Sequence, residues 1–156
     1  MNVNDIVEVA RKKADDERLH QANIDPFSLE EIKETGGIFK KIILPKLQEL
    51  KTRLEQGHFL VRIYSVPYLD VMPDKLRRID FVVARVPEGT TIDERVEEWL
   101  EHSGSRMVFM ANPERGFISV SMTVFGKRYN GQRYSNADID PQRIESMIFK
   151  LVNVIS

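Results

Sequence analysis

The sequence predicts an α+β fold in which an antiparallel or mixed sheet of four to five strands carries helices on one face. Up to about Gly57 the apolar residues recur at helical spacing, whereas the later part contains short runs rich in β-branched and aromatic residues. Between residues 117 and 125 apolar and polar residues alternate, which is typical of a strand with one buried face. The expected order is a helical region followed by β-β-α-β-β-α.

Length and composition predict an ordinary globular chain. It has 156 residues, of which 42% are hydrophobic and 30% charged, with a net charge of −1. The absence of cysteine excludes disulfides, thiolate zinc sites and thiol catalysis. The first twenty residues lack the apolar run of a secretory signal, and no apolar stretch is long enough to cross a bilayer. We therefore expect a cytoplasmic protein with no membrane partner.

The chain divides into a helical N-terminal extension, residues 1–44, and an α+β domain, residues 45–156. A first helix is expected over residues 3–21. A short second helix begins at Ser28 and is expected to stop at Gly36-Gly37. The following helix should kink or start afresh at Pro45 and close at Gly57.

The later elements follow from periodicity and turn residues. In the helix expected from Thr91, that residue and Glu94 form a capping box, and Asp140 caps the last helix. Asn112-Pro113-Glu114-Arg115 suits a turn, while an edge segment over 69–72 stays open. The expected elements are strands over 58–66 and 76–86, a helix over 91–103, a hairpin over 106–125 and a helix over 141–155.

From about Pro45 onward this order resembles that of the type III secretion chaperones. The segments that carry the resemblance are "RVEEWLEHSG", "RMVFMANPERGFISVSMTVF" and "PQRIESMIFKLVNVI". The resembling region, from about Pro45 to residue 156, covers about two thirds of the chain, and the likeness lies in order and spacing, without a diagnostic motif. Members of that family bind other proteins and are commonly homodimers paired through the middle helix. The resemblance implies an interaction protein without chemistry of its own.

The sequence offers no catalytic, cofactor or metal motif. Its three histidines, His20, His58 and His102, have no helical spacing to one another, and each is expected to be structural or solvated. Asp138 and Asp140 are two residues apart, but two carboxylates supply too few oxygen ligands for a hard cation. We expect no catalytic residue, no metal and no cofactor. An enzyme that uses carboxylates with His58 or His102 in a pocket is the third hypothesis.

Charge is distributed unevenly between neighbouring segments. Residues 90–104 carry five acidic residues against one arginine, and residues 105–135 carry five basic residues against one glutamate. The two charged segments are either independent, solvated surfaces, or surfaces of complementary charge that face each other within one chain or across a dimer. Trp99 is expected on the buried side of its helix, and with Glu97 it becomes a candidate for a shared dimer surface through the family resemblance.

The stretch "VFGKRYNGQRYS" contains a strong hairpin turn signal, Asn130-Gly131. A turn there would set Arg128 opposite Arg133, two like charges that need an anion. A protein carboxylate, such as Asp138 or Glu145, is favoured over a phosphate. The hairpin 127–134, called here the basic finger, would also carry Lys127, Tyr129 and Tyr134. Basic and aromatic side chains of this kind bind single-stranded nucleic acid in other proteins.

Taken together, these patterns predict a non-enzymatic protein-binding adaptor or chaperone-like protein that forms a homodimer. Its binding surface would include the 91–103 helix, the N-terminal arm, and an outer row on the 117–125 strand that begins with Phe117 and ends with Phe125. The alternative is a nucleic-acid-binding protein that uses the basic, aromatic hairpin 127–134. The near-neutral net charge and the acidic neighbouring helix argue against that alternative.

Overall fold

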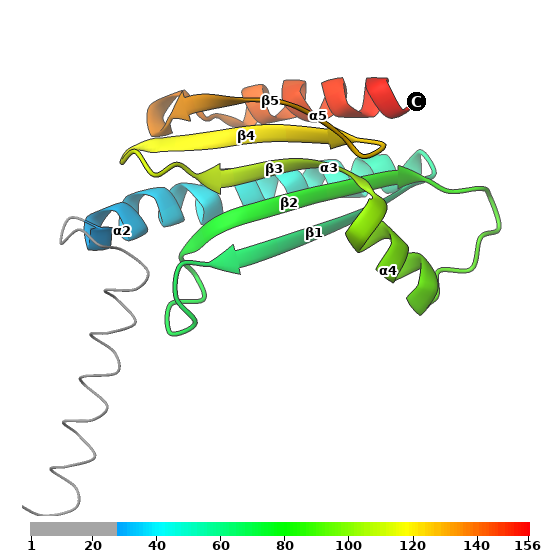
Figure 1. Ribbon diagram of the computed structural model, residues 1–156, viewed down its shortest axis with the longest axis horizontal. Coiled ribbons are helices and arrows are strands. Elements are labelled where there is room, and N and C mark those ends of the chain that lie inside the picture. The colour runs from blue at the N-terminus through cyan, green and yellow to red at the C-terminus, as the bar shows by residue number, and fades with distance from the viewer. Residues whose placement is uncertain (1–27) are drawn as a thin grey trace, which may run out of the picture.

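The computed structural model describes residues 28–156, so the helix expected over 3–21 lies outside the described residues. The described chain combines a long helical segment, a five-stranded sheet and two further helices (Figure 1). In chain order the elements are α2 (Ser28–Ile38), η1 (Phe39–Ile43), α3 (Leu44–Gln56), β1 (Phe59–Pro67), β2 (Leu76–Arg85), α4 (Glu94–Ser103), β3 (Ser105–Ala111), β4 (Phe117–Val124), β5 (Lys127–Ser135), η2 (Asn136–Asp138) and α5 (Pro141–Ile155).

The five strands follow one another across the sheet in the order β1-β2-β3-β4-β5, and each neighbouring pair is antiparallel. The predicted α+β class and antiparallel sheet are therefore confirmed. The expected β-β-α-β-β-α order is wrong, because a third strand, β5, follows β4 and the order becomes β-β-α-β-β-β-α. Residues 69–72, a possible edge strand in the sequence, form a turn between β1 and β2.

The helical segment runs without interruption from α2 through η1 to α3. The stop expected at Gly36-Gly37 is wrong, because Gly36 serves close packing: a Cβ there would lie 3.1 Å from the Cα of Lys75. As expected, an α-helix starts at the proline: α3 begins at Leu44 with Pro45 in its first turn, although the helical segment continues into it through η1. A π-helical turn precedes the proline, in which the Leu44 N–H donates to the Phe39 carbonyl, and it relieves the ring clash. As expected, α3 ends at Gly57.

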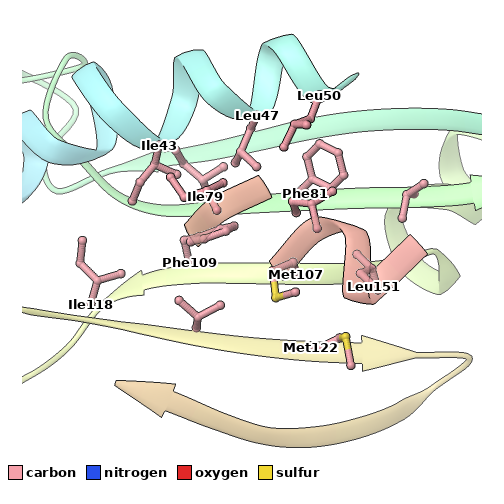
Figure 2. Packing of buried hydrophobic residues seen from close by; sticks show 14 of the residues in the cluster. Ile43, Leu47, Leu50, Ile79, Phe81, Met107, Phe109, Ile118, Met122 and Leu151 are labelled. Carbon is pink, nitrogen blue, oxygen red and sulfur yellow. The ribbon is translucent and has the colours of Figure 1, made fainter. Parts of the chain in front are cut away.

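One face of the sheet, called here the inner face, packs beneath the helices of this segment and α5 (Figure 2). Phe81 and Phe109 are fully buried there, together with Leu47 of α3 and Ile148 of α5. Phe39, which precedes the boundary expected at residue 45, belongs to the same buried cluster. The described part of the expected extension, residues 28–44, therefore packs on the sheet.

The helix α4 lies on the opposite face, the outer face, so the expectation that the helices share one face is wrong for α4 (Figure 1). Leu100 packs there against Leu60, Val82 and Ala84, which alternate with inner-face residues along β1 and β2. Its N-cap is Asp93, whose side chain accepts hydrogen bonds from the N–H groups of Arg95 and Val96. The capping box at Thr91 is thus wrong, since the helix begins at Glu94.

The hairpin between β4 and β5 turns at Phe125-Gly126, so the turn expected at Asn130-Gly131 is wrong. Phe125 has φ 48° and Gly126 has φ 81°, and two positive φ angles are the signature of a type I′ turn. Residues 130 and 131 instead form a bulge in β5 opposite Ser121, between the pairs Val120↔Gln132 and Met122↔Tyr129. Arg128 consequently pairs with Thr123 and Arg133 with Ser119, not with each other.

Two other local predictions are confirmed. Asn112 begins the β3–β4 turn, and its side-chain oxygen accepts a hydrogen bond of 2.8 Å from the Glu114 N–H. Asp140 caps α5, its carboxylate accepting from the Arg143 N–H at 2.7 Å. No helix among residues 28–156 is both long and apolar enough to cross a membrane.

Candidate functional site

Within residues 28–156, only part of the outer face is covered. The helix α4 packs over β1 and β2, while no other described helix lies over the outer-face side chains of the other three strands. Cross-strand partners share a face, so the register Val82↔Arg106↔Thr123↔Arg128 carries the outer face from β2 to β5. We call this region the uncovered strip; its members are Arg106, Val108, Met110, Phe117, Ser119, Ser121, Thr123, Arg128 and Arg133.

A buried carboxylate lies on the outer face, on the strand next to the strip. Asp80 of β2 is only 6% exposed, yet it accepts hydrogen bonds from Arg78 at 2.6 Å and from Arg106 at 3.1 Å. A carboxylate in this position needs both guanidinium groups to offset the free energy of leaving water. Arg106 also donates to the Glu101 carbonyl in the last turn of α4. The network therefore fixes the position of Arg106 within the strip and ties α4 to β3.

A second ion pair ties α4 to β1. The Arg62 Nε donates to both carboxylate oxygens of Glu97 at 3.0 Å. This hydrogen bond from Arg62 lowers the pKa of Glu97 below its ordinary value, and it raises the pKa of Arg62. Glu97, a predicted interface residue, thus already has a partner within its own chain.

The two arginines of β5 have different surroundings. Arg133 forms an ion pair with Glu114 in the β3–β4 turn, and its guanidinium lies 4.4 Å from the centroid of the Phe117 ring. The expectation that a protein carboxylate neutralises Arg133 is confirmed, but the residue is Glu114 and not Asp138 or Glu145. Among the described residues Arg128 forms no ion pair and is exposed.

The exposed side of α4 has the opposite charge. A shallow depression of about 700 Å³ lies between α4 and β1, lined by Tyr64, Ile92 and the carboxylates Asp93, Glu94, Glu97, Glu98 and Glu101. Burial raises the pKa of Tyr64, and the nearby Glu101 and Glu97 raise it further. The outer face is therefore acidic over α4 and basic over the strip.

The predicted site residues do not form one surface. Arg128, Arg133 and Phe117 belong to the strip, and Glu97 and Trp99 to α4. Trp99, expected on the buried side of its helix, is 48% exposed, because Leu100 and Val96 face the sheet. Lys127 and Tyr129 pair with inner-face residues Val124 and Met122, and Phe125 is 78% exposed at the turn.

Sequence reasoning missed Arg78, Asp80 and Arg106. The signal was present in "LRRIDFVV", where Arg78 and Asp80 alternate with Ile79 and Phe81. Charged residues at that spacing within an apolar strand share one face and pair with each other.

Within the described part of the chain, the structure brings together no histidine-based centre. His58, directly after α3, and His102, in the last turn of α4, are both exposed. Between residues 28 and 156 no group of three or more histidine, aspartate or glutamate side chains is arranged to hold a metal ion. His20 lies outside the described residues.

Comparison with protein-family models, with curated proteins and with solved structures finds no match to this chain. The arrangement of its own residues is therefore the basis for a functional proposal.

Proposed function

We propose that this protein is a non-catalytic, chaperone-like binding protein that self-associates through its outer face. In the dimer the α4 of each copy lies on the uncovered strip of the other. The observation that carries the proposal is that α4 covers only the β1–β2 half of the outer face, next to a strip of opposite charge. With both α4–strip contacts formed reciprocally between the same two copies, the contact is isologous and closes as a two-fold dimer.

Charge complementarity orients the two copies. The exposed glutamates Glu94, Glu98 and Glu101 of one α4 would face Arg128 and its neighbours on the partner strip. Such pairs add more to orientation and association rate than to affinity.

Affinity would come from apolar groups at the centre of the contact. Trp99 is 48% exposed on α4, and Met110 is 40% exposed on the strip. Large aromatic side chains that are exposed in the free chain are frequent anchors of interfaces. Small residues on β4, namely Ser119, Ser121 and Thr123, leave room between the longer side chains of β3 and β5 for a helix.

A dimer built through the middle helix also agrees with the resemblance to type III secretion chaperones, although the additional strand β5 departs from that pattern. By that analogy, the dimer would bind a segment of another protein. This role follows from the resemblance and the absence of recognisable chemistry together.

A charge exchange tests the dimer. Reversing Glu98→Arg or Arg128→Glu alone should weaken dimerisation about tenfold or more, because each creates like charges across the contact. Combining the two should restore much of the affinity. Trp99→Ala should weaken the dimer, and adding a charge reversal at Glu97 should weaken it further. The dissociation constant is measured by analytical ultracentrifugation, with Lys33→Glu on α2 as the matched reversal. A wild-type protein that stays monomeric at tens of micromolar would refute the proposal.

The alternative of nucleic-acid binding through residues 127–134 has one observation in its favour, the exposed Arg128. However, the other outer-face arginines, Arg62, Arg78, Arg106 and Arg133, have carboxylate partners within the chain. If it held, Arg128→Ala combined with Arg133→Ala would abolish a salt-dependent gel shift; no shift by the wild type at low salt would exclude it.

A further inference from the structure

A second hollow lies on the inner face, and of its lining residues only Ser121, opposite the β5 bulge, also belongs to the strip. It is a groove of about 480 Å³ between α5 and the strands β4 and β5. Its volume falls within the range of roughly 300–1,000 Å³ that small-molecule sites occupy. Tyr129, predicted to serve a nucleic-acid finger, is one of the residues that line it.

The lining is mostly apolar and adaptable. Three methionines from three different elements meet there, Met107 of β3, Met122 of β4 and Met147 of α5, and Val154 extends the wall toward the end of α5. Unbranched thioether side chains change rotamer at low cost, so they accommodate apolar chains of varied shape.

Five lining residues carry a polar group, namely Ser121, Tyr129, Gln132, Tyr134 and Lys150, and two of these groups satisfy each other. The Tyr134 hydroxyl donates to the side-chain oxygen of Gln132. Lys150 of α5 also lines the groove, is exposed, and has no ion pair among the described residues. A second ammonium group, that of Lys127, lies 5.5 Å from the centroid of the Tyr129 ring.

Of the carboxylates in residues 28–156, none lines the groove to neutralise these cations. Glu145, the acidic residue of α5, is occupied by Arg53 at 2.5 Å and by Lys46 at 3.9 Å. An apolar groove with an uncompensated cation at its rim is complementary to a molecule that is apolar along its length and anionic at one end.

An added peptide strand fits this place less well, although β5 is an edge strand. The bulge at residues 130 and 131 interrupts the ladder in the middle of β5, and Lys127, Arg128 and Arg133 place charges along it. Bulges and charges on an edge strand are the features that prevent strand addition.

We propose that the groove between α5 and β4–β5 binds a linear amphiphile with one anionic head group. The apolar chain lies among Met107, Met122 and Met147, and the head group lies at Lys150.

The methionine methyl groups provide the test. The full-length protein is labelled with ¹³C-methyl methionine and titrated with laurate below the concentration at which laurate forms micelles. Met107, Met122 and Met147 should shift saturably, while Met72 in the β1–β2 loop and Met110 on the strip should not. Undecyltrimethylammonium, which has the same eleven-carbon alkyl group with a cationic head, should bind about three- to fivefold more weakly.

The lysine variant separates the head-group contact from general hydrophobic binding. Lys150→Ala should weaken laurate binding about three- to fivefold and leave undecyltrimethylammonium binding unchanged or tighter, with Lys33→Ala as the matched control. The absence of saturable shifts, equal shifts at Met72 and Met110, or no difference between the two head groups would overturn the proposal. So would dilution-dependent shifts of the groove methionines without laurate, because these would assign the groove to a second copy. Dilution-dependent shifts of Met110 alone report on the outer-face dimer, so the two proposals fail separately.

Discussion

The two faces of the sheet are built from the same strands but hold their helices by different interactions. On β2 the inner-face residues Ile79, Phe81 and Val83 are buried beneath α3 and α5. The alternate residues Arg78 and Asp80 face outward, and there α4 is held by one small apolar cluster and by ion pairs. The inner face thus supplies most of the folding free energy, and the outer face presents a charged surface of defined geometry.

This difference has an energetic cause. Apolar burial contributes in proportion to area and without direction, whereas partly exposed ion pairs contribute about 1 kcal/mol or less each. Glu97 and Arg62 are partly exposed, so their pair fixes where α4 lies more than it stabilises the fold. Asp80 is the exception, because a buried carboxylate becomes costly as soon as one arginine is removed.

The largest expected effect comes from two adjacent residues of β3 that point to opposite faces. Phe109 is fully buried on the inner face, and Met110 is 40% exposed on the outer face. Phe109→Ala should lower the free energy of unfolding by about 3–5 kcal/mol, because it leaves a cavity under the helices. Met110→Ala should lower it by less than about 1 kcal/mol. Urea unfolding at a protein concentration low enough to avoid dimerisation measures both. Similar losses for the two variants would show that the faces do not differ in this way.

The sequence was sufficient for the features that depend on local pattern. The alternation along β4 correctly predicted that Ile118 and Val120 are buried and that Ser119 and Ser121 lie on the other face. It was not sufficient for the position of α4. The apolar stripe of Val96 and Leu100 shows that one side of α4 is buried, but either face of a sheet can provide the partner.

The strand β5 and its face assignments were missed because a local signal competed with a long-range one. Asn-Gly at 130 and 131 favours a type I′ turn, yet the chain turns five residues earlier. The observed register pairs β5 along almost all of β4 and places Tyr134 next to buried Ile118. Ladder hydrogen bonds and burial over eight residues outweigh the preference of a two-residue turn.

An effect of intermediate size on stability is expected at the β4–β5 turn. This turn sets the register of β5 and therefore decides which face each β5 residue occupies. Phe125 has φ 48°, a conformation that bulky residues rarely adopt, and it is 78% exposed. Phe125→Asn should raise the free energy of unfolding by about 1 kcal/mol, because asparagine tolerates this conformation. Thermal and urea unfolding measure the change.

Gly126→Ala provides the opposite control, since φ is 81° at this glycine and an alanine there should destabilise the protein by about 1 kcal/mol or more. A loss of stability in Phe125→Asn would mean that the Phe125 ring packs against another surface in solution. The turn would then belong to a third packed region, and the division of the molecule into two faces would be incomplete.

The smallest effect concerns two glutamates, one on each side of the sheet. The hydrogen bond from Arg62 lowers the pKa of Glu97 on the outer side, and the one from Arg53 lowers the pKa of Glu145 on α5. A lowered carboxyl pKa adds stability above the ordinary value of 4.5, and that contribution is lost as the pH falls through the folded-state pKa. In a ¹³C-carboxyl NMR titration, Arg62→Ala should raise the midpoint of Glu97 and leave that of Glu145 unchanged, and Arg53→Ala should do the reverse. If Arg62→Ala also moved Glu145, charge would couple the two sides through the sheet, contrary to the independence of the faces that their separate packing implies.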